Sequence, residues 1–165
     1  MNSIGKKLSG MAAAAAVAPF VLVAAANADT PNTVYFNYGP EVNCAITGDG
    51  TVGCDVAPSR IVAIPVGNAA VPVPFPVDQV VIDQPALPAH PGFARGAFTR
   101  PGGNPNMSDV KTGEGYASIS VSHAGATCVA TGGHYSGPGL SCTSKGHAFS
   151  LYSTGGGVRS GIIMS

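Results

Sequence analysis

Histidines are the residues of this chain that could supply metal ligation or general-base chemistry. The chain has four of them, His90, His123, His134 and His147. A zinc site needs three or four ligands that converge on the ion at about 2.1 Å, and its histidines usually stand only a few residues apart. The last three histidines are separated by 11 and 13 residues, which matches no compact ligand set. We therefore predict no metal site.

Two short motifs resemble those of serine nucleophiles. Ser108 and Lys111 fit the pattern S-x-x-K, but that motif works at the start of a helix inside a much larger fold with further motifs. Residues 102–114 are instead typical of a loop. Residues 133–137, with the sequence G-H-Y-S-G, lack the G-x-S-x-G spacing of a nucleophile elbow. Neither motif indicates a catalytic serine.

The carboxylates offer no better candidate for catalysis. Asp78 and Asp83 are an odd number of positions apart, so within one strand they face opposite sides. Glycoside hydrolysis needs two carboxylates that converge on one bond. We predict no catalytic residue, no cofactor-binding residue and no cofactor, and the sequence leaves open whether the chain is an enzyme.

The four cysteines predict two disulfides. They are Cys44, Cys54, Cys128 and Cys142, and an even number of cysteines in an exported chain is typical of a disulfide framework. Three connectivities are possible from the count alone. Cys44 and Cys54 flank a turn centred on Asp49 between two glycines, and the other two cysteines flank the glycine-rich residues 132–139. Because each pair would face across a hairpin, we predict Cys44–Cys54 and Cys128–Cys142.

The first 28 residues have the three regions of a secretory signal peptide. Lys6 and Lys7 precede an apolar run at residues 11–26, and the run ends in A-N-A at residues 26–28. A transmembrane helix needs about 20 apolar residues, whereas this run is shorter and mostly alanine. We expect cleavage after residue 28, which leaves residues 29–165 as a single secreted domain without a transmembrane helix.

The charge of the mature chain argues against a nucleic-acid partner. The full chain has eight basic and eight acidic residues, and removal of Lys6 and Lys7 leaves a net charge of −2. The remaining basic residues are scattered along the sequence. Nucleic-acid binding requires a basic patch that releases counterions from phosphates. We therefore predict no nucleic-acid binding.

Strand patterns dominate the rest of the chain. Short β-branched or aromatic runs are bounded by Gly, Pro, Asn or Asp, and residues 116–122 alternate apolar and polar side chains as a half-buried strand does. We expect an all-β domain, a small sandwich or jelly-roll-like fold with two hairpin disulfides. The expected strands are residues 33–37, 42–46, 51–56, 60–64, 116–122, 126–130, 140–143 and 147–152, with a last short strand or a frayed end at 156–165.

Residues 58–105 have a different composition, with ten prolines that include V-P-V-P-F-P-V at residues 71–77. Alternating prolines cannot donate to a central sheet ladder, so this stretch is predicted to be an extended crossover along an edge or over the surface. One interpretation is a proline motif that docks in a groove. We favour the other, a rigid loop whose valines and phenylalanines cover the sheet.

Three stretches of the sequence form a pattern that resembles a known group. They are N-C-A-I-T-G-D-G-T-V-G-C-D at residues 43–55, V-I-D-Q-P-A-L-P-A-H-P-G at 81–92 and S-C-T-S-K-G-H-A-F at 141–149. The chain resembles, over most of its mature part, uncharacterised small secreted proteins of mycobacteria and related actinomycetes. The resemblance implies an actinobacterial source and export. It implies no catalytic residue, because none is defined for that group.

Three classes of function remain open. The favoured one is a secreted or cell-envelope-associated binding or structural protein, whose partner is an envelope or extracellular ligand. The second is an extracellular enzyme inhibitor that presents a disulfide-clamped loop such as residues 132–139, since a rigid loop loses little entropy on binding. The third is a small secreted hydrolase that uses His123 or His147. All three place the protein outside the cell or at the cell-envelope surface.

Overall fold

The computed structural model describes residues 32–132, 139–153 and 160–165. The expected signal peptide, residues 1–28, lies outside the described residues. The same is true of residues 133–138, which hold His134 and most of the glycine-rich loop. In the described ranges, no helix has the length and apolar character needed to cross a membrane.

The described part of the chain is almost entirely β-structure, which confirms the predicted all-β class. One short 3-10 helix, η1 (Met107–Asp109), interrupts the strands. The strands are β1 (Val34–Asn37), β2 (Val42–Ile46), β3 (Val52–Val66), β4 (Ala69–Ile82), β5 (His90–Pro91), β6 (Gly113–Gly115), β7 (Ser118–His123), β8 (Ala126–Thr131), β9 (Gly139–Ser144), β10 (His147–Ser153) and β11 (Ser160–Met164).

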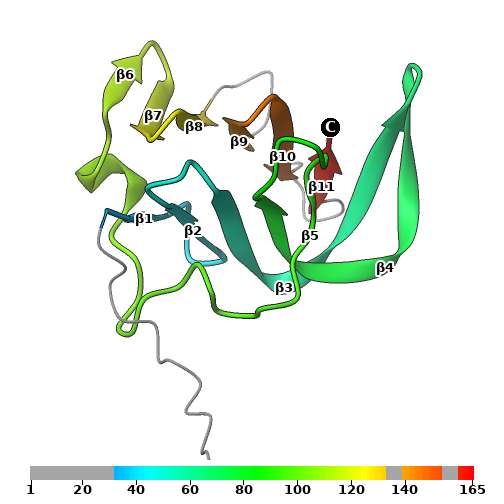
Figure 1. Ribbon diagram of the computed structural model, residues 1–165, viewed down its shortest axis with the longest axis horizontal. Helices are drawn as coiled ribbons and strands as arrows, with labels where there is room; N and C mark the ends of the chain where they lie inside the picture. The colour runs from blue at the N-terminus through cyan, green and yellow to red at the C-terminus, as the bar shows by residue number, and fades with distance from the viewer. Residues whose placement is uncertain (1–31, 133–138, 154–159) are drawn as a thin grey trace, which may run out of the picture.

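These strands belong to one sheet that curls around the core. The strand order is β1-β2-β3-β11-β10-β9-β8-β7-β6, and β4 pairs with β3 and with the short β5. In Figure 1 the strands from β11 back to β6 arch over the layer that contains β1, β2 and β3. The curled sheet therefore encloses its core as the two layers of a sandwich do.

Strand β3 is the point at which the sheet divides. Its first part pairs antiparallel with β2 from Val52 to Val56, and its second part pairs parallel with β11 from Ile61 to Ala63. The register of β3 against β4 shifts between these two parts, from Asp55 to Arg60. Pro58 lies in this interval and has no N–H to donate to a ladder. Thus β2 and β11 pair with successive parts of β3, and neither pairs with the residues between these parts.

Side chains from both halves of the sheet meet in the core. Phe36 and Ile46 from β1 and β2 belong to the same buried cluster as Val121, Phe149 and Ile162 from the arched half. A smaller cluster lies on the other face of β1 to β4, where Phe98 covers Tyr35, Ala45 and Val81. A side chain at Gly53 would overlap the Phe98 ring, which explains the glycine near the start of β3.

Both predicted disulfides are present. Cys44 and Cys54 are directly opposite in β2 and β3, with Cα atoms 4.1 Å apart. Cys128 and Cys142 are opposite in β8 and β9, at 4.0 Å. All four side chains are fully buried in the main core cluster, so each disulfide clamps a hairpin and fills space between the two halves of the sheet.

The loop that follows β4 is held against the sheet by two polar side chains. The carboxylate of Asp55 accepts hydrogen bonds from the backbone N–H groups of Gly96 and Phe98, at 3.1 and 2.9 Å. The amide of Asn104, which is 8% exposed, lies within hydrogen-bond distance of the carbonyls of Phe36 and Cys44. These contacts place Phe98 over the sheet. Phe98 thus covers the sheet, as we predicted for the phenylalanines of residues 58–105.

The earlier part of the proline-rich stretch is a long hairpin. The predicted strands 51–56 and 60–64 are one strand, β3, and V-P-V-P-F-P-V lies within β4. Gly67 and Asn68 form the two-residue turn, since Val66 pairs with Ala69. In Figure 1 this hairpin projects beyond the rest of the sheet.

Candidate functional site

The histidines considered for catalysis or metal binding lie at separate places. The Nε2 atom of His123 is 2.9 Å from the carbonyl of Asn32, and that of His147 is 3.0 Å from the carbonyl of Pro85. Each ring thus contacts backbone of a different loop. Across the described ranges, no group of three or more His, Cys, Asp or Glu side chains is arranged to hold a metal ion.

The S-x-x-K residues are engaged in local surface contacts. The Ser108 hydroxyl lies 2.9 Å from Oδ1 of Asn106, which caps η1. Lys111 forms an ion pair with Glu114 at 2.5 Å. The serine and the lysine therefore each have other partners, and the motif has no sign of a nucleophile and its base.

His90 and Asp83 form a pair that could act as a general base and its orienting carboxylate. Nε2 of His90 is 3.1 Å from Oδ1 of Asp83, and Nδ1 is 3.0 Å from the carbonyl of Pro91. Burial alone lowers the pKa of His90, but the hydrogen bonds to Pro91 and Asp83 and the Asp83 charge outweigh burial, and the pKa is raised. Both ring nitrogens are engaged, so the pair joins β5 to the end of β4 and presents no free base.

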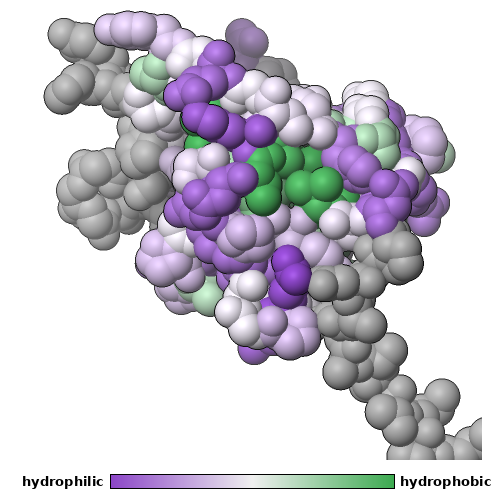
Figure 2. Space-filling view, turned by 90° about the vertical axis from the view of Figure 1, so that its left-hand side faces the viewer, coloured by the Kyte–Doolittle hydropathy of each residue, from purple (hydrophilic) through white to green (hydrophobic). Residues whose placement is uncertain are grey.

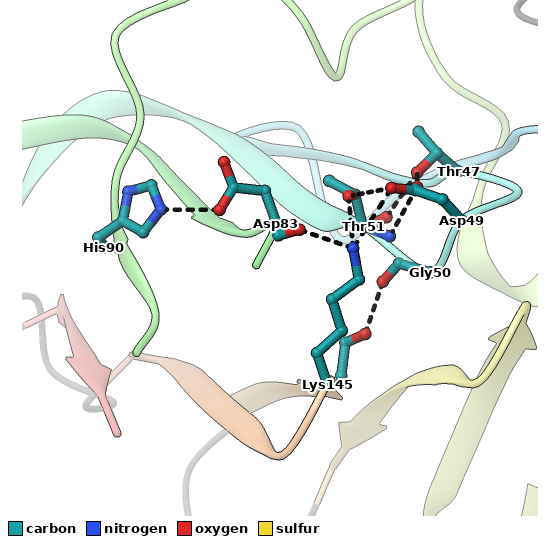
Figure 3. A network of polar contacts seen from close by, with 8 residues as sticks. Thr47, Asp49, Gly50, Thr51, Asp83, His90 and Lys145 are labelled. Carbon is teal, nitrogen blue, oxygen red and sulfur yellow. Dashed lines mark hydrogen bonds and ion pairs between the residues drawn. The ribbon is translucent and has the colours of Figure 1, made fainter. Parts of the chain in front are cut away.

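A polar network connects this pair to the turns of two hairpins (Figure 3). Nζ of Lys145, in the β9–β10 turn, is 2.6 Å from the carbonyl of Asp83 and 3.1 Å from the Thr51 hydroxyl. It also forms an ion pair with Asp49 at 3.3 Å. The Ser144 hydroxyl donates to the carbonyl of Gly50 at 2.5 Å. The β9–β10 turn is therefore fastened to the β2–β3 turn.

Asp49 is held by its own turn. Its carboxylate accepts a hydrogen bond from the Thr47 hydroxyl at 2.5 Å and from the Thr51 N–H at 3.0 Å. These bonds, the one from Thr47 foremost, place the pKa of Asp49 well below its ordinary value. An ionised carboxylate that is paired with Lys145 stabilises the turn, and every polar group described in this network has a structural role.

A cavity of about 420 Å³ opens beside β3, between the start of β2 and β11. Its lining is mostly apolar and includes Tyr38 and Tyr152. Arg60 and Glu41, which form an ion pair, also line it. Burial raises the pKa of Tyr38. The lining residues are Tyr38, Gly39, Pro40, Glu41, Val42, Val56, Arg60, Leu151, Tyr152 and Gly161.

The cavity follows from the division of the sheet. Tyr152 and Gly161 are cross-strand partners in β10 and β11, and a side chain at Gly161 would overlap the Tyr152 ring. The ring therefore lies across the glycine backbone, a known way to cover glycine in a sheet. An apolar hollow with a few polar groups has the general character of a small-ligand site.

The projecting hairpin is the most unusual surface of the protein. We name residues 61–77 the apolar arm. It carries no charged residue, and Asn68 in the turn is its one polar side chain. Five of its large apolar side chains are 46–60% exposed, namely Ile61, Ile64, Val66, Val71 and Phe75, whereas Val62 and Val77 at its base are buried in the core.

The apolar residues of the arm and those at the other end of the molecule differ in their surroundings. On the face that carries β6 and β7, hydrophobic residues form a patch bordered by hydrophilic residues (Figure 2). The arm instead projects into solvent (Figure 1). Soluble proteins rarely expose contiguous apolar surface without a binding role. Neither the arm nor the cavity was identified from the sequence, although the uncharged run at 61–77 and the Gly-Asn turn were visible signals.

The fold and these features define a class, that of all-β proteins with two hairpin disulfides and an exposed apolar arm. The two disulfides and the lack of a membrane-spanning helix in the described residues are compatible with an extracellular protein. Comparisons of the chain with protein-family models, curated proteins and solved structures find no match.

Proposed function

We propose that this chain is a non-catalytic binding protein that works outside the cytoplasm, at the cell envelope or beyond it, and that it contacts its ligand through the apolar arm. The observation that carries the proposal is the exposure of five large apolar side chains on an element without charge. Such surface is costly to leave in water, so a ligand that covers it gains binding free energy.

Export is supported by the N-terminal pattern and by the sulfur chemistry. Residues 1–28 have the basic, apolar and A-x-A regions of a signal peptide. No free cysteine is present in the structure, and disulfides of this kind persist in oxidising compartments. The proposal therefore places the working protein where both hairpin clamps remain intact.

The two alternative functions have less support. A hydrolase would need His123 or His147 beside a carboxylate, whereas each contacts a backbone carbonyl. An inhibitor would present residues 132–139, and most of that loop lies outside the described residues. The apolar arm offers a contact surface that requires neither feature.

The proposal is tested by replacing two exposed side chains of the arm with charge. The oxidised chain is mixed with cell-envelope material and sedimented. We expect the wild type to co-sediment and the double variant Val66→Asp/Val71→Asp to stay in solution, because a carboxylate resists transfer out of water. Neither replacement disturbs the core, since both side chains are about half exposed.

Tyr116→Asp is the matched control. Tyr116 is a fully exposed aromatic residue in the turn after β6, at the opposite end of the molecule from the arm (Figure 1). We expect this variant to co-sediment as the wild type does. Equal sedimentation of the arm variant and the control would contradict a role of the arm in binding.

A further inference from the structure

Resting on this proposed function, we propose that the ligand of the apolar arm is a lipid surface. The turn of the arm enters between acyl chains, and the charged residues at its base remain at the level of the headgroups. Four features of the arm lead to this inference: its two faces, its proline spacing, its charged base and its length.

Both faces of the arm are apolar. In an antiparallel pair, residues opposite one another point their side chains to the same face, and the register between β3 and β4 assigns them. A protein groove would cover one face of a hairpin and leave the other in water, whereas hydrocarbon surrounds both. One face carries Ile64, Val66, Ala69 and Val71, and the other carries Pro65 and Pro72. Ala63 lies on the second face but is buried against the body.

The prolines reduce the cost of removing the backbone from water. Pro72, Pro74 and Pro76 occupy every second position of β4, and a strand that pairs with β3 accepts proline with its nitrogen directed away from the partner. Three backbone N–H donors are thus absent from this part of β4. An unpaired N–H group in hydrocarbon is strongly unfavourable, so this spacing suits an apolar surrounding.

Charged residues begin where the arm ends. Arg60 and Asp78 flank the arm in the sequence, and Arg60 pairs with Val77 in the register between β3 and β4. Arg60 forms an ion pair with Glu41, and Asp78 forms one with Arg95. Two pairs of opposite charge therefore surround the base, which complements a layer of polar headgroups above uncharged hydrocarbon.

The free length of the arm matches the depth of an interfacial element. The strand β11 pairs with β3 only as far as Ala63, so the part beyond it runs from Ile64 to the turn at Gly67. At roughly 3.3 Å per residue this part is about 10 Å long. Elements that lie in the interface bury their apolar side chains to a depth of about 5–10 Å.

Strand addition is the main alternative, by a second copy or by another protein. An added strand needs a row of N–H donors and carbonyl acceptors at an open edge. The three prolines remove N–H donors from this part of β4, and natural proteins use proline in edge strands to prevent such pairing. The arm therefore favours contact through its side chains.

The test uses a single tryptophan as a probe, since the chain has none. Val66→Trp places the probe at the end of the arm, and Tyr116→Trp places it in the exposed turn at the opposite end. Each oxidised full-length variant is mixed with vesicles of phosphatidylethanolamine and phosphatidylglycerol. We expect the emission of Val66→Trp to shift to shorter wavelength and to be quenched by brominated acyl chains, and that of Tyr116→Trp to stay unchanged.

A second variant measures the effect of charge. We expect Val66→Asp to weaken sedimentation with the same vesicles by tenfold or more, since moving a carboxylate into hydrocarbon is costly. Unchanged Val66→Trp emission would overturn the lipid inference. If the arm-dependent binding to envelope material persisted in that case, the proposed function would stand and the ligand would be a protein. If that binding were also absent, the proposed function and the lipid inference would both be wrong. A dimer in the absence of lipid that Val66→Asp dissociates would also overturn the inference.

Discussion

Asp55 is a single residue with an extensive polar role in the described structure. Its carboxylate accepts hydrogen bonds from Gln79, Gly96, Phe98 and Thr99, at 2.7–3.1 Å. Gln79 is 2% exposed and also donates to the carbonyl of Ala94. One side chain in β3 thereby positions the loop that covers the outer face of the sheet.

We expect Asp55→Ala to lower the free energy of unfolding by about 3 kcal/mol, because it leaves partly buried donors without an acceptor. Asp55→Asn should cost less, since it retains one acceptor oxygen. Urea denaturation followed by circular dichroism measures both. Asp109→Ala, an exposed control in η1, should stay within about 0.5 kcal/mol of the wild type. A loss for Asp55→Ala as small as that of the control would show that the loop is held by other contacts.

His90 gives the stability a pH dependence. Its pKa is raised in the folded chain by the contacts to Pro91 and Asp83, which outweigh burial. The stabilisation is therefore complete below the ordinary pKa of about 6.5 and is lost as the pH rises through the folded value. We expect the urea midpoint to fall between about pH 5.5 and pH 8, and to fall less in His90→Gln. An identical pH dependence in the variant would contradict this account.

At the scale of elements, two hairpins are closed by disulfides, and the long β3–β4 hairpin is not. The β2–β3 and β8–β9 hairpins have Cys44–Cys54 and Cys128–Cys142 across them, whereas the β3–β4 hairpin is held at its base by β11 and by the core contacts of Val73 and Val77. The two clamped hairpins belong to the enclosed body, whereas the end of the β3–β4 hairpin projects from it as the arm.

We expect removal of either disulfide to cost about 3 kcal/mol of unfolding free energy, because loops of this length lose comparable chain entropy when they are closed. The double variants Cys44→Ala/Cys54→Ala and Cys128→Ala/Cys142→Ala test each pair, with alanine chosen because all four positions are fully buried. Urea denaturation without reductant supplies the measurement. A loss below about 1 kcal/mol for either pair would mean that the disulfide does not restrict the unfolded chain as the loop length predicts.

At the scale of the whole molecule, the curled sheet brings the C-terminal strands against the first half of the chain. The last strand, β11, lies parallel to the middle of β3, and the turn before β10 is tied to the turn before β3 by Lys145 and Ser144. The arm can project because these long-range contacts hold the body around its base.

Export is the prediction that belongs to the whole chain. We expect the protein outside the cell to begin at Asp29, because the A-x-A sequence at residues 26–28 presents small residues to signal peptidase. N-terminal sequencing of the exported protein measures the start, and Ala28→Arg should block processing. Full-length protein in the cytosol with its four thiols free would contradict both the cleavage and the compartment.

Much of the fold was predictable because its signals are local. The strand pattern at residues 116–122 and the turn between Cys44 and Cys54 depend on neighbours in the sequence, and the structure has them as β7 and as the β2–β3 turn. The Gly-Asn turn at 67–68 was an equally local signal. It was outweighed by the prolines of residues 71–77, which favoured a surface loop over a paired strand.

The amino-acid sequence by itself determined the all-β class, the two cysteine pairs and the uncharged composition of residues 61–77, since each depends on spacing within about fifteen residues. Only the tertiary structure decided that β11 pairs with Ile61–Ala63 of β3, that a cavity opens beside Arg60 and that Lys145 meets Asp49. These contacts join segments some 100 residues apart, and their register depends on how the whole sheet curls around one core, which no local pattern of residues specifies.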